Sequence, residues 1–385
     1  MLSKSDRRIA FQIALCAIGF RLLSAFIGFL CNVVFPLDRP EQFTVFGTTS
    51  PFWDTFARYD TGYFQDIAWS GYAPAPGGRS NIAYFPMYPL LIRWIGELFG
   101  HHHATYYVTA VGIAWVSYVL AMVVLYYLAR LDLPEGPSAR AVLLMTIFPF
   151  SFFFGVAYSE STFILFALLA FYLFRTKRWI LGGICGAIAT ATRVPGILIL
   201  PALTWIAWKT AEPTKDDRLR ALAGLVLAAS GFTAYCAYIY SVTGNPLEWA
   251  ATLQRWGYYP GGSPWMAPVK LVQTLVTHPY QYLAGDHMAP YDTLYGITGI
   301  AFALMVPFVW MRLGAAYGLF MLLNLYLPFS SGVFEGVGRY CSVLFPAFIW
   351  LATLRSGVVA TGLVVVFSLF YTLGLALFTT IHPLF

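Results

Sequence analysis

The chain alternates between long apolar runs and short polar segments from residue 10 to residue 381. An α-helix needs roughly 20 apolar residues to cross a hydrocarbon core of about 30 Å. Runs near that length lie at residues 10–34, 104–129, 139–157, 160–174, 179–192, 194–208, 219–243, 291–311, 314–329, 340–354 and 357–380. The pattern therefore predicts an all-α integral membrane protein with about eleven transmembrane helices.

The composition agrees with that pattern. Of the 385 residues, 59% are apolar and 10% are charged, and the mean hydropathy is +0.68. Such values exclude the soluble globular class. Because no shift in composition separates one part of the chain from another, we predict a single polytopic membrane domain over residues 1–385.

The basic residues predict the orientation. The formal net charge is +6, and lysine and arginine gather in short segments such as 4–8, 175–178 and 209–220. Cytoplasmic loops carry such an excess, so we predict a cytoplasmic N-terminus and an extracytoplasmic C-terminus. The charge is thus a topology signal and does not indicate nucleic-acid binding. This orientation leaves two long extracytoplasmic loops, at about residues 35–103 and 244–290.

Residues 82–100 test this topology because they are apolar enough to be mistaken for a span. They contain Pro86, Pro89, Arg93 and Glu97. A further span here would invert every later loop and place the basic segments outside, against the bias. We therefore predict an interfacial or re-entrant helix within the first long loop.

Several kinds of chemistry have no motif in this sequence. It lacks the GxGxxG, GxxxxGK[ST] and HExxH patterns, so use of a cytosolic nucleotide is not indicated. The five cysteines show no CxxC spacing. Adjacent imidazoles cannot all face one ion from a regular element, so we interpret the run His101–His103 as a loop before a span. No metal site and no cofactor are predicted.

The first long loop holds a candidate general base. Carboxylates beside aromatic and membrane-facing residues lose hydration, which makes them usable bases. The run RYDTGYFQDIAW places Asp60 in such surroundings, and Asp60 is the carboxylate that we favour. The alternative is that Asp54 and Asp60 only cap short surface helices, as loop aspartates often do.

The same loop resembles a known family. The runs RYDTGYFQDIAWSGY and NIAYFPMYPLLIR resemble the signature of the PIG-V-like mannosyltransferases, which include the enzyme that adds the second mannose of GPI anchors and many bacterial relatives. Tyr59 stands where that signature usually has Trp, and Tyr84 stands where Phe is common. Both changes keep an aromatic ring.

Four further segments resemble the same family in the same order. They are Phe148–Phe166 with its Glu-Ser pair, Arg178–Pro201 with Thr-Arg-x-x-Gly, Gly244–Gly257 in which Asn245 replaces an acid, and Gly338–Phe348 with Arg-Tyr and Phe-Pro. The similarity covers most of residues 45–350.

The resemblance implies a membrane-embedded glycosyltransferase of the type C fold. Such an enzyme takes a sugar, here implied to be mannose, from a polyprenyl-phosphate-linked donor on the extracytoplasmic face and passes it to a lipid or glycan acceptor. Asp60 would accept the proton of the acceptor hydroxyl in a single inverting displacement. The expected substrate-binding residues of this loop are Asp54, Arg58, Tyr59, Tyr63 and Asp66.

The leaving phosphate needs a cation, and the outer face offers three arginines beside predicted helix ends. These are Arg193, Arg255 and Arg339, of which Arg339, followed by Tyr340, is the first choice. The alternative for each is snorkelling to the interface or a carboxylate partner, such as Glu335 for Arg339.

Two charged residues fall within predicted spans. Glu160 begins one of them, where pairing with Arg193 competes with a role in sugar binding. Arg21 lies roughly 17 Å into the first span at about 1.5 Å per residue, so it needs a partner or a polar cavity. It contacts the carrier lipid or belongs to a buried structural pair.

Two other functions stay open at this point. A transporter or flippase for a lipid-linked saccharide would also need many spans, but transporters place charges near the membrane midplane, whereas most acids here lie in outer loops. A non-catalytic subunit of a glycosyltransferase complex is the other alternative. The sequence has no Asn-x-Ser/Thr sequon, which favours a bacterial plasma membrane over the endoplasmic reticulum.

Overall fold

The computed structural model describes residues 3–38, 50–75, 77–257, 263–280, 290–331, 334, 336–382 and 384. Every regular element in these residues is a helix. The two long loops are therefore described only in part, because residues 39–49 and 281–289 lie outside the described residues.

Five of the described helices are long and apolar enough to cross a membrane. They are α1 (Lys4–Val34), α6 (His103–Ala129), α11 (Lys215–Thr243), α15 (Pro290–Leu313) and α19 (Gly357–Thr379). Each coincides with a run that the hydropathy pattern predicts as a span. For the described residues, an all-helical fold with helices suited to span a membrane is thus confirmed.

The other predicted spans are shorter or interrupted helices. They are α7 (Glu135–Thr146), α8 (Glu160–Arg175), α9 (Trp179–Thr190), α10 (Leu200–Thr210), α16 (Ala315–Phe329) and α18 (Phe345–Leu351). Several are well below the length of roughly 20 residues that a straight span needs. The count of eleven spans is therefore not confirmed.

Proline explains the two clearest interruptions. The predicted span 139–157 is α7 followed by a separate 3-10 helix, η3 (Ser151–Gly155), and Pro149 lies between them. The predicted span 340–354 divides into a short helix and α18, whose first turn contains Pro346. Proline lacks an N–H donor and clashes with the preceding turn, so it favours the first turn of a helix and often ends or interrupts the helix before it.

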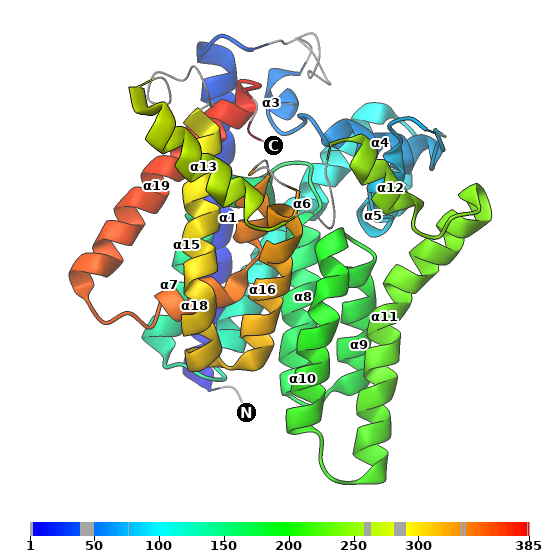
Figure 1. The fold of residues 1–385 in the computed structure, drawn as a ribbon, viewed down its shortest axis with the longest axis vertical. Coiled ribbons are helices and arrows are strands. Elements are labelled where there is room, and N and C mark those ends of the chain that lie inside the picture. The colour runs from blue at the N-terminus through cyan, green and yellow to red at the C-terminus, as the bar shows by residue number, and fades with distance from the viewer. Residues whose placement is uncertain are drawn as a thin grey trace.

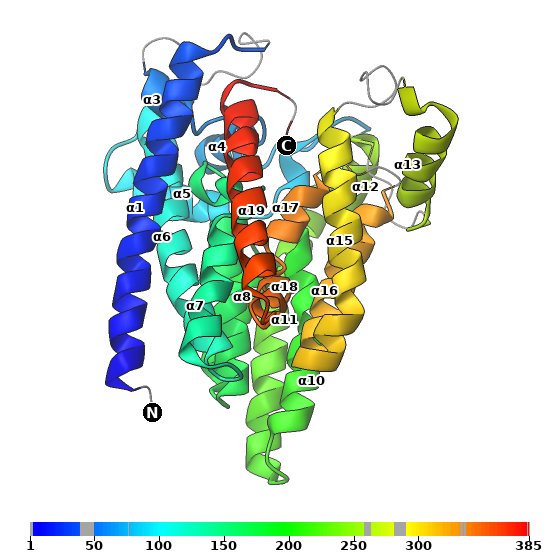
Figure 2. The same cartoon turned by 90° about the vertical axis from the view of Figure 1, so that its left-hand side faces the viewer.

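The remaining helices come mainly from the loops and gather at one end of the bundle, opposite the N-terminus (Figures 1 and 2). They are α3 (Pro51–Asp54), α4 (Thr61–Ser70), η2 (Asn81–Ala83), α5 (Met87–Glu97), η4 (Val194–Ile199), α12 (Glu248–Arg255), α13 (Met266–Thr277) and α17 (Val337–Ser342). The C-terminus lies at this same end (Figure 1). With 11 residues, α5 is too short to span a membrane.

Glycines allow α9 and α11 to pack closely. A Cβ atom on Gly183 would lie 2.5 Å from the carbonyl oxygen of Gly224, and one on Gly231 would lie in contact with the carbonyl oxygen of Ala187. Small residues at such contacts are the usual way in which membrane helices approach one another. This packing fixes the end of α9, and Arg193 follows that end.

Arg21 is buried within α1 and has no carboxylate partner among the described residues. Its guanidinium lies 4.3 Å from the centre of the Tyr118 ring, and its Nη2 donates to the Tyr371 hydroxyl at 3.0 Å. Cation–π contact and hydroxyl bonding stabilise the buried charge in place of a carboxylate. Arg21 therefore has structural partners on α6 and α19.

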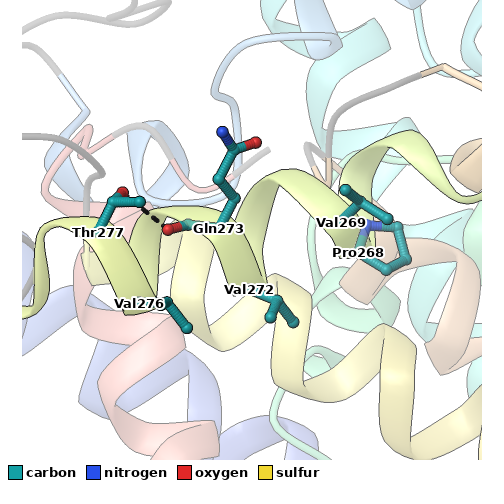
Figure 3. A pocket seen from close by; sticks show the side chains of 6 residues that line it. All are labelled: Pro268, Val269, Val272, Gln273, Val276 and Thr277. Carbon is teal, nitrogen blue, oxygen red and sulfur yellow. Dashed lines mark hydrogen bonds between the residues drawn. The ribbon is translucent and has the colours of Figure 1, made fainter.

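The helix α13 presents an apolar face outward (Figure 3). Val269 is 60% exposed and Val276 is 74% exposed on this face. An amphipathic helix beside the end of a membrane bundle is typical of an interfacial position. The face contains none of the residues of the site described below.

Candidate active site

A cavity of about 630 Å³ lies among the loop helices. Its walls come from α4, η2, η4, α12, α16 and α17, together with the chain segments next to them and those before α8 and after α9. Its lining residues are Tyr59, Asp60, Tyr63, Phe64, Arg79, Ala83, Tyr84, Phe85, Ser159, Thr192, Arg193, Val194, Pro195, Trp249, Leu253, Trp256, Leu327, Pro328, Ser331, Gly336, Arg339 and Tyr340. A ligand of this size would contact aromatic rings and a few charged groups, as is typical of binding pockets.

Asp60 is placed in this cavity by the chain geometry just before α4. The preceding Tyr59 has a φ of 47°, a left-handed conformation that is uncommon outside glycine. The Asp60 amide donates to the Tyr158 hydroxyl at 3.2 Å, which fixes the start of α4. The Asp60 side chain is 18% exposed and therefore still accessible from the cavity.

Two donors hold the Asp60 carboxylate. The Tyr84 hydroxyl donates to Oδ1 at 2.9 Å, and Arg339 Nη1 donates to Oδ2 at 2.6 Å. Burial and the charge of Asp60 raise the pKa of Tyr84 well above its usual value, so its hydroxyl stays protonated and donates. A carboxylate has about four acceptor positions, so Asp60 keeps capacity for a further hydrogen bond.

Aromatic rings form the wall beside Asp60. Tyr63 stacks on Tyr84 with ring centroids 4.8 Å apart and an angle of 13° between the planes. Trp256, which follows α12, lies 4.9 Å from Tyr63 and 5.6 Å from Tyr84. Such flat faces suit a sugar ring or another largely apolar surface.

A chain of alternating charges runs from Asp60 into the protein. Arg339 also donates from Nε to Glu160 Oε1 at 2.8 Å, and Arg193 Nη1 lies 2.5 Å from the same oxygen. Glu160 is fully buried at the first residue of α8, where the helix N-terminus favours a negative charge. A buried carboxylate thus fixes two arginines that face the cavity.

A close approach of two segments positions Arg339. A Cβ atom on the preceding Gly338 would overlap the ring of Phe150, so only glycine fits there. The Arg339 guanidinium also lies 4.6 Å from the centre of the Tyr158 ring. The packing of α17 on this aromatic cluster therefore sets the direction in which Arg339 points.

The structure brings seven of the predicted site residues together. Six line the cavity, and Glu160 lies behind the lining; the six are Tyr59, Asp60, Tyr63, Arg193, Arg339 and Tyr340. The carboxylate partners of Arg339 are Asp60 and Glu160, whereas Glu335 lies outside the described residues. These residues are far apart in the sequence and come from four separate segments.

Arg58 and Asp54 do not line the cavity, contrary to our expectation that they bind substrate. Arg58 is fully buried and pairs with Asp54 at 2.8 Å. It also donates to Asn32 Oδ1 at 2.8 Å and to the carbonyl oxygen of Thr379. The pair therefore joins the first loop to α1 and α19.

Asp66 and Arg255 also lie outside the cavity lining. Asp66 accepts a hydrogen bond from Asn81 Nδ2 at 2.8 Å, which holds the loop before η2 against α4. Arg255 pairs with Glu248 at 2.7 Å within α12. Both contacts are internal to the elements around the cavity, so these two residues support its walls.

Arg79 lines the cavity, and the sequence did not single it out. It follows a Pro/Gly-rich turn. From the sequence alone, an arginine in such a turn is used only to predict the orientation of the chain in the membrane. The signal that could have found it is its place between the two halves of the family-like signature, which the fold brings together around Asp60. Trp249 and Trp256 went unnoticed for a similar reason, because tryptophan near a membrane end is common.

The histidine run has an aromatic environment. His101 and His103 each stack on Trp69, with ring centroids 4.1 Å and 3.9 Å apart. In the described part of the chain, no three His, Cys, Asp or Glu side chains gather as they would around a metal ion.

No protein-family model matches the chain. No curated protein matches it either.

Solved structures resemble this one. The oligosaccharyltransferase of Archaeoglobus fulgidus, solved with a tethered acceptor peptide, matches 96% of this chain and 55% of its own, with a TM-score of 0.51 and 11% identity. ArnT from Cupriavidus metallidurans, solved with undecaprenyl phosphate, matches 96% of this chain and 76% of its own, with a TM-score of 0.49 and 13% identity. The chain spans about half the length of the oligosaccharyltransferase. The first likeness shows that the chain has the membrane-embedded fold of type C glycosyltransferases.

Proposed function

We propose that this chain is a glycosyltransferase that moves a sugar from a polyprenyl-phosphate-linked donor to an acceptor hydroxyl with inversion at the anomeric carbon. The observation that carries the proposal is the carboxylate of Asp60, exposed to a cavity of about 630 Å³ whose lining also holds three arginines and an aromatic wall. The shared fold supports the same reading. The cavity is large enough for a sugar and a phosphate together.

In the proposed reaction, Asp60 acts as the general base. Its carboxylate accepts the proton of the acceptor hydroxyl while the acceptor oxygen forms a bond to the anomeric carbon. The bond between that carbon and the phosphate oxygen breaks, and the lipid phosphate leaves with its electron pair. Tyr84 and Arg339 hold Asp60 in one orientation, which keeps the base aligned with the attacking oxygen.

Arg339 is proposed to act at the reaction centre. Its guanidinium lies between Asp60 and Glu160, so it compensates the negative charge that grows on the phosphate as the sugar leaves. Arg193 stands behind it through their common partner Glu160. Glu160 keeps both arginines in place. We therefore assign it to pairing with the arginines and not to sugar binding.

We propose mannose as the sugar and the PIG-V-like family as the nearest group. The support is the order of the five family-like segments, three of which supply the cavity residues Asp60, Arg193 and Arg339. The acceptor is a lipid or glycan that reaches the cavity from the membrane or from the extracytoplasmic space.

The direct test is transfer by the purified chain. It is incubated with a panel of polyprenyl-phosphate-linked sugars and candidate lipid or glycan acceptors, and the freed carrier and the product are identified by mass spectrometry. We expect release of polyprenyl phosphate with mannose as the preferred sugar. Turnover of none of the donors would refute the proposal.

The proposed orientation places the cavity on the extracytoplasmic side of a bacterial plasma membrane. The structure supports it because the loop helices and the C-terminus lie at the end of the bundle opposite the N-terminus (Figures 1 and 2). A cysteine at Gly78 should react with an impermeant thiol reagent added to intact cells, and one at Thr214 should not. The reverse labelling would place the cavity in the cytoplasm.

A further inference from the structure

The cavity contains more positive than negative charge. Arg79, Arg193 and Arg339 belong to its lining, and Asp60 is the carboxylate among the lining residues. Glu160, behind the lining, is the other carboxylate in contact with these arginines. Three cations against two anions leave one positive charge for a ligand to balance.

Two of the three arginines are already engaged. Glu160 Oε1 lies 2.5 Å from Arg193 and 2.8 Å from Arg339, and Asp60 Oδ2 lies 2.6 Å from Arg339. If a phosphate took either arginine completely, Glu160 would lose one of its two cations, and removal of Arg339 would also take the cation from Asp60. Such a loss is costly where water does not reach, so these arginines are poor first contacts for an anion.

Arg79 is the arginine that carries the surplus charge. It is exposed, and it makes no ion pair and no hydrogen bond with any residue that the structure describes. Its charge also acts on Tyr63 in the aromatic wall of the cavity. Burial and Asp60 raise the pKa of Tyr63, and Arg79 opposes that rise.

The backbone around Arg79 is held in place despite its exposure. Ser80 Oγ donates to the carbonyl oxygen of Ala73 at 2.8 Å, and the Ala73 amide donates to Asn81 Oδ1 at 2.9 Å. Asn81 in turn is bonded to Asp66. This network anchors the residues that follow Arg79 to the end of α4, so Arg79 projects from a fixed position on the cavity rim.

We infer that Arg79 is the docking residue for the phosphate of the lipid carrier, and that it binds this group before Arg339 acts on it. The inference rests on the proposed function, because it assigns the donor phosphate to one end of the same cavity. A guanidinium offers two parallel N–H donors to phosphate oxygens, which suits a phosphate ester better than a point charge does. Arg79 thus governs donor affinity, whereas Arg339 governs the rate of transfer.

The test is equilibrium binding of a radiolabelled polyprenyl monophosphate to the purified full-length chain in detergent. The variants are Arg79→Gln and Arg79→Lys, and the control is Arg93→Gln, which removes an exposed arginine of α5 outside the cavity lining. We expect Arg79→Gln to raise Kd about tenfold or more and Arg79→Lys to raise it less, since Lys keeps the charge but not the fork. Arg93→Gln should leave Kd unchanged. Equal affinity of Arg79→Gln and the unaltered chain would overturn the inference.

Competition separates the sources of phosphate. Unlabelled polyprenyl monophosphate should displace the probe, and polyprenol without phosphate should do so poorly. Vesicles of phosphatidylglycerol and millimolar inorganic phosphate should compete only weakly in comparison. Displacement by phosphatidylglycerol as strong as by the carrier would overturn the assignment to the carrier and give the site to bulk anionic lipid.

The binding assay tests the docking role of Arg79 separately from the proposed transfer reaction. If the chain binds polyprenyl phosphate through Arg79 but transfers no sugar, the reaction is refuted and the docking role stands. If the chain transfers sugar while Arg79→Gln keeps both the donor KM and the Kd, the docking role is refuted and the reaction stands.

Discussion

Two aspartates of the first loop, Asp54 and Asp60, each pair with an arginine, and the two pairs have different surroundings. Arg58 and Asp54 are 2.8 Å apart, with side chains 0% and 3% exposed. Arg339 and Asp60 are 2.6 Å apart, with side chains 13% and 18% exposed. The separation of the charges is similar, so the distance alone does not distinguish a structural pair from a functional one.

The difference lies in what surrounds each pair. The remaining donors of Arg58 are taken by Asn32 and the backbone of Thr379, so no group is left for a ligand. Asp60, by contrast, borders a cavity and keeps acceptor capacity. Loss of the first pair should therefore be seen in folding, and loss of the second in turnover.

The largest effect is expected for Asp60→Asn. Asparagine keeps the size and one acceptor of the side chain but cannot take up the proton, so transfer should fall by about 10²–10⁴-fold. Donor binding and the thermal unfolding temperature should change little. Transfer rates and unfolding are measured together with Asp132→Asn as the control, a carboxylate that pairs with Arg175 outside the cavity lining. Near-normal turnover of Asp60→Asn would remove Asp60 as the base.

The next effect is expected for Arg58→Met, and it concerns stability. Asp54 then loses its arginine in a buried site, which costs about 3–5 kcal/mol and lowers the yield of monodisperse protein. The double variant Asp54→Asn with Arg58→Met removes both charges and should recover part of the loss. Unfolding temperatures in detergent measure both. A stable but inactive Arg58→Met would instead assign this pair to substrate binding.

A smaller loss is expected for Arg339→Ala. Removal of one preorganised donor to developing charge costs about 10²-fold in kcat, and Arg339→Lys should restore part of it. Donor Kd should change much less than kcat, because Arg339 is already bonded to two carboxylates before the donor binds. Steady-state kinetics and the binding assay decide this. A change confined to Kd would exchange the roles of Arg339 and Arg79.

The smallest of these effects is expected for Tyr84→Phe. It removes one hydrogen bond to a carboxylate, so kcat should fall by about tenfold. The stacking on Tyr63 persists because the ring is kept. Unchanged turnover would show that Arg339 alone orients the carboxylate.

Much of the fold could be predicted from the apolar runs. The five long helices coincide with predicted spans because length and hydropathy together determine whether a helix can cross a bilayer. The interruptions at Pro149 and Pro346 were missed, since the phenylalanines around them keep the hydropathy high through the break. Hydropathy averaged along the chain does not show where the hydrogen bonds of a helix end.

The site could be predicted in part. Asp60, Arg193 and Arg339 were proposed separately from the sequence, but their contacts through Glu160 depend on the packing of distant helices. Arg58 was expected to bind substrate, but it is buried away from the cavity that Asp60 lines. The left-handed backbone of Tyr59 lies between the two residues, and that conformation has no signature at a tyrosine.

Gly338, the residue beside Arg339, contributes no chemistry, yet it limits how this site can evolve. It has no side chain to bind, donate or ionise, but even one methyl group there would overlap the ring of Phe150. Alanine at Gly338 would therefore displace this turn of α17. Sequence drift around the site must carry position 338 and the ring at position 150 together, whereas another cation at position 339 would keep the charge and lose the fork that joins Asp60 to Glu160.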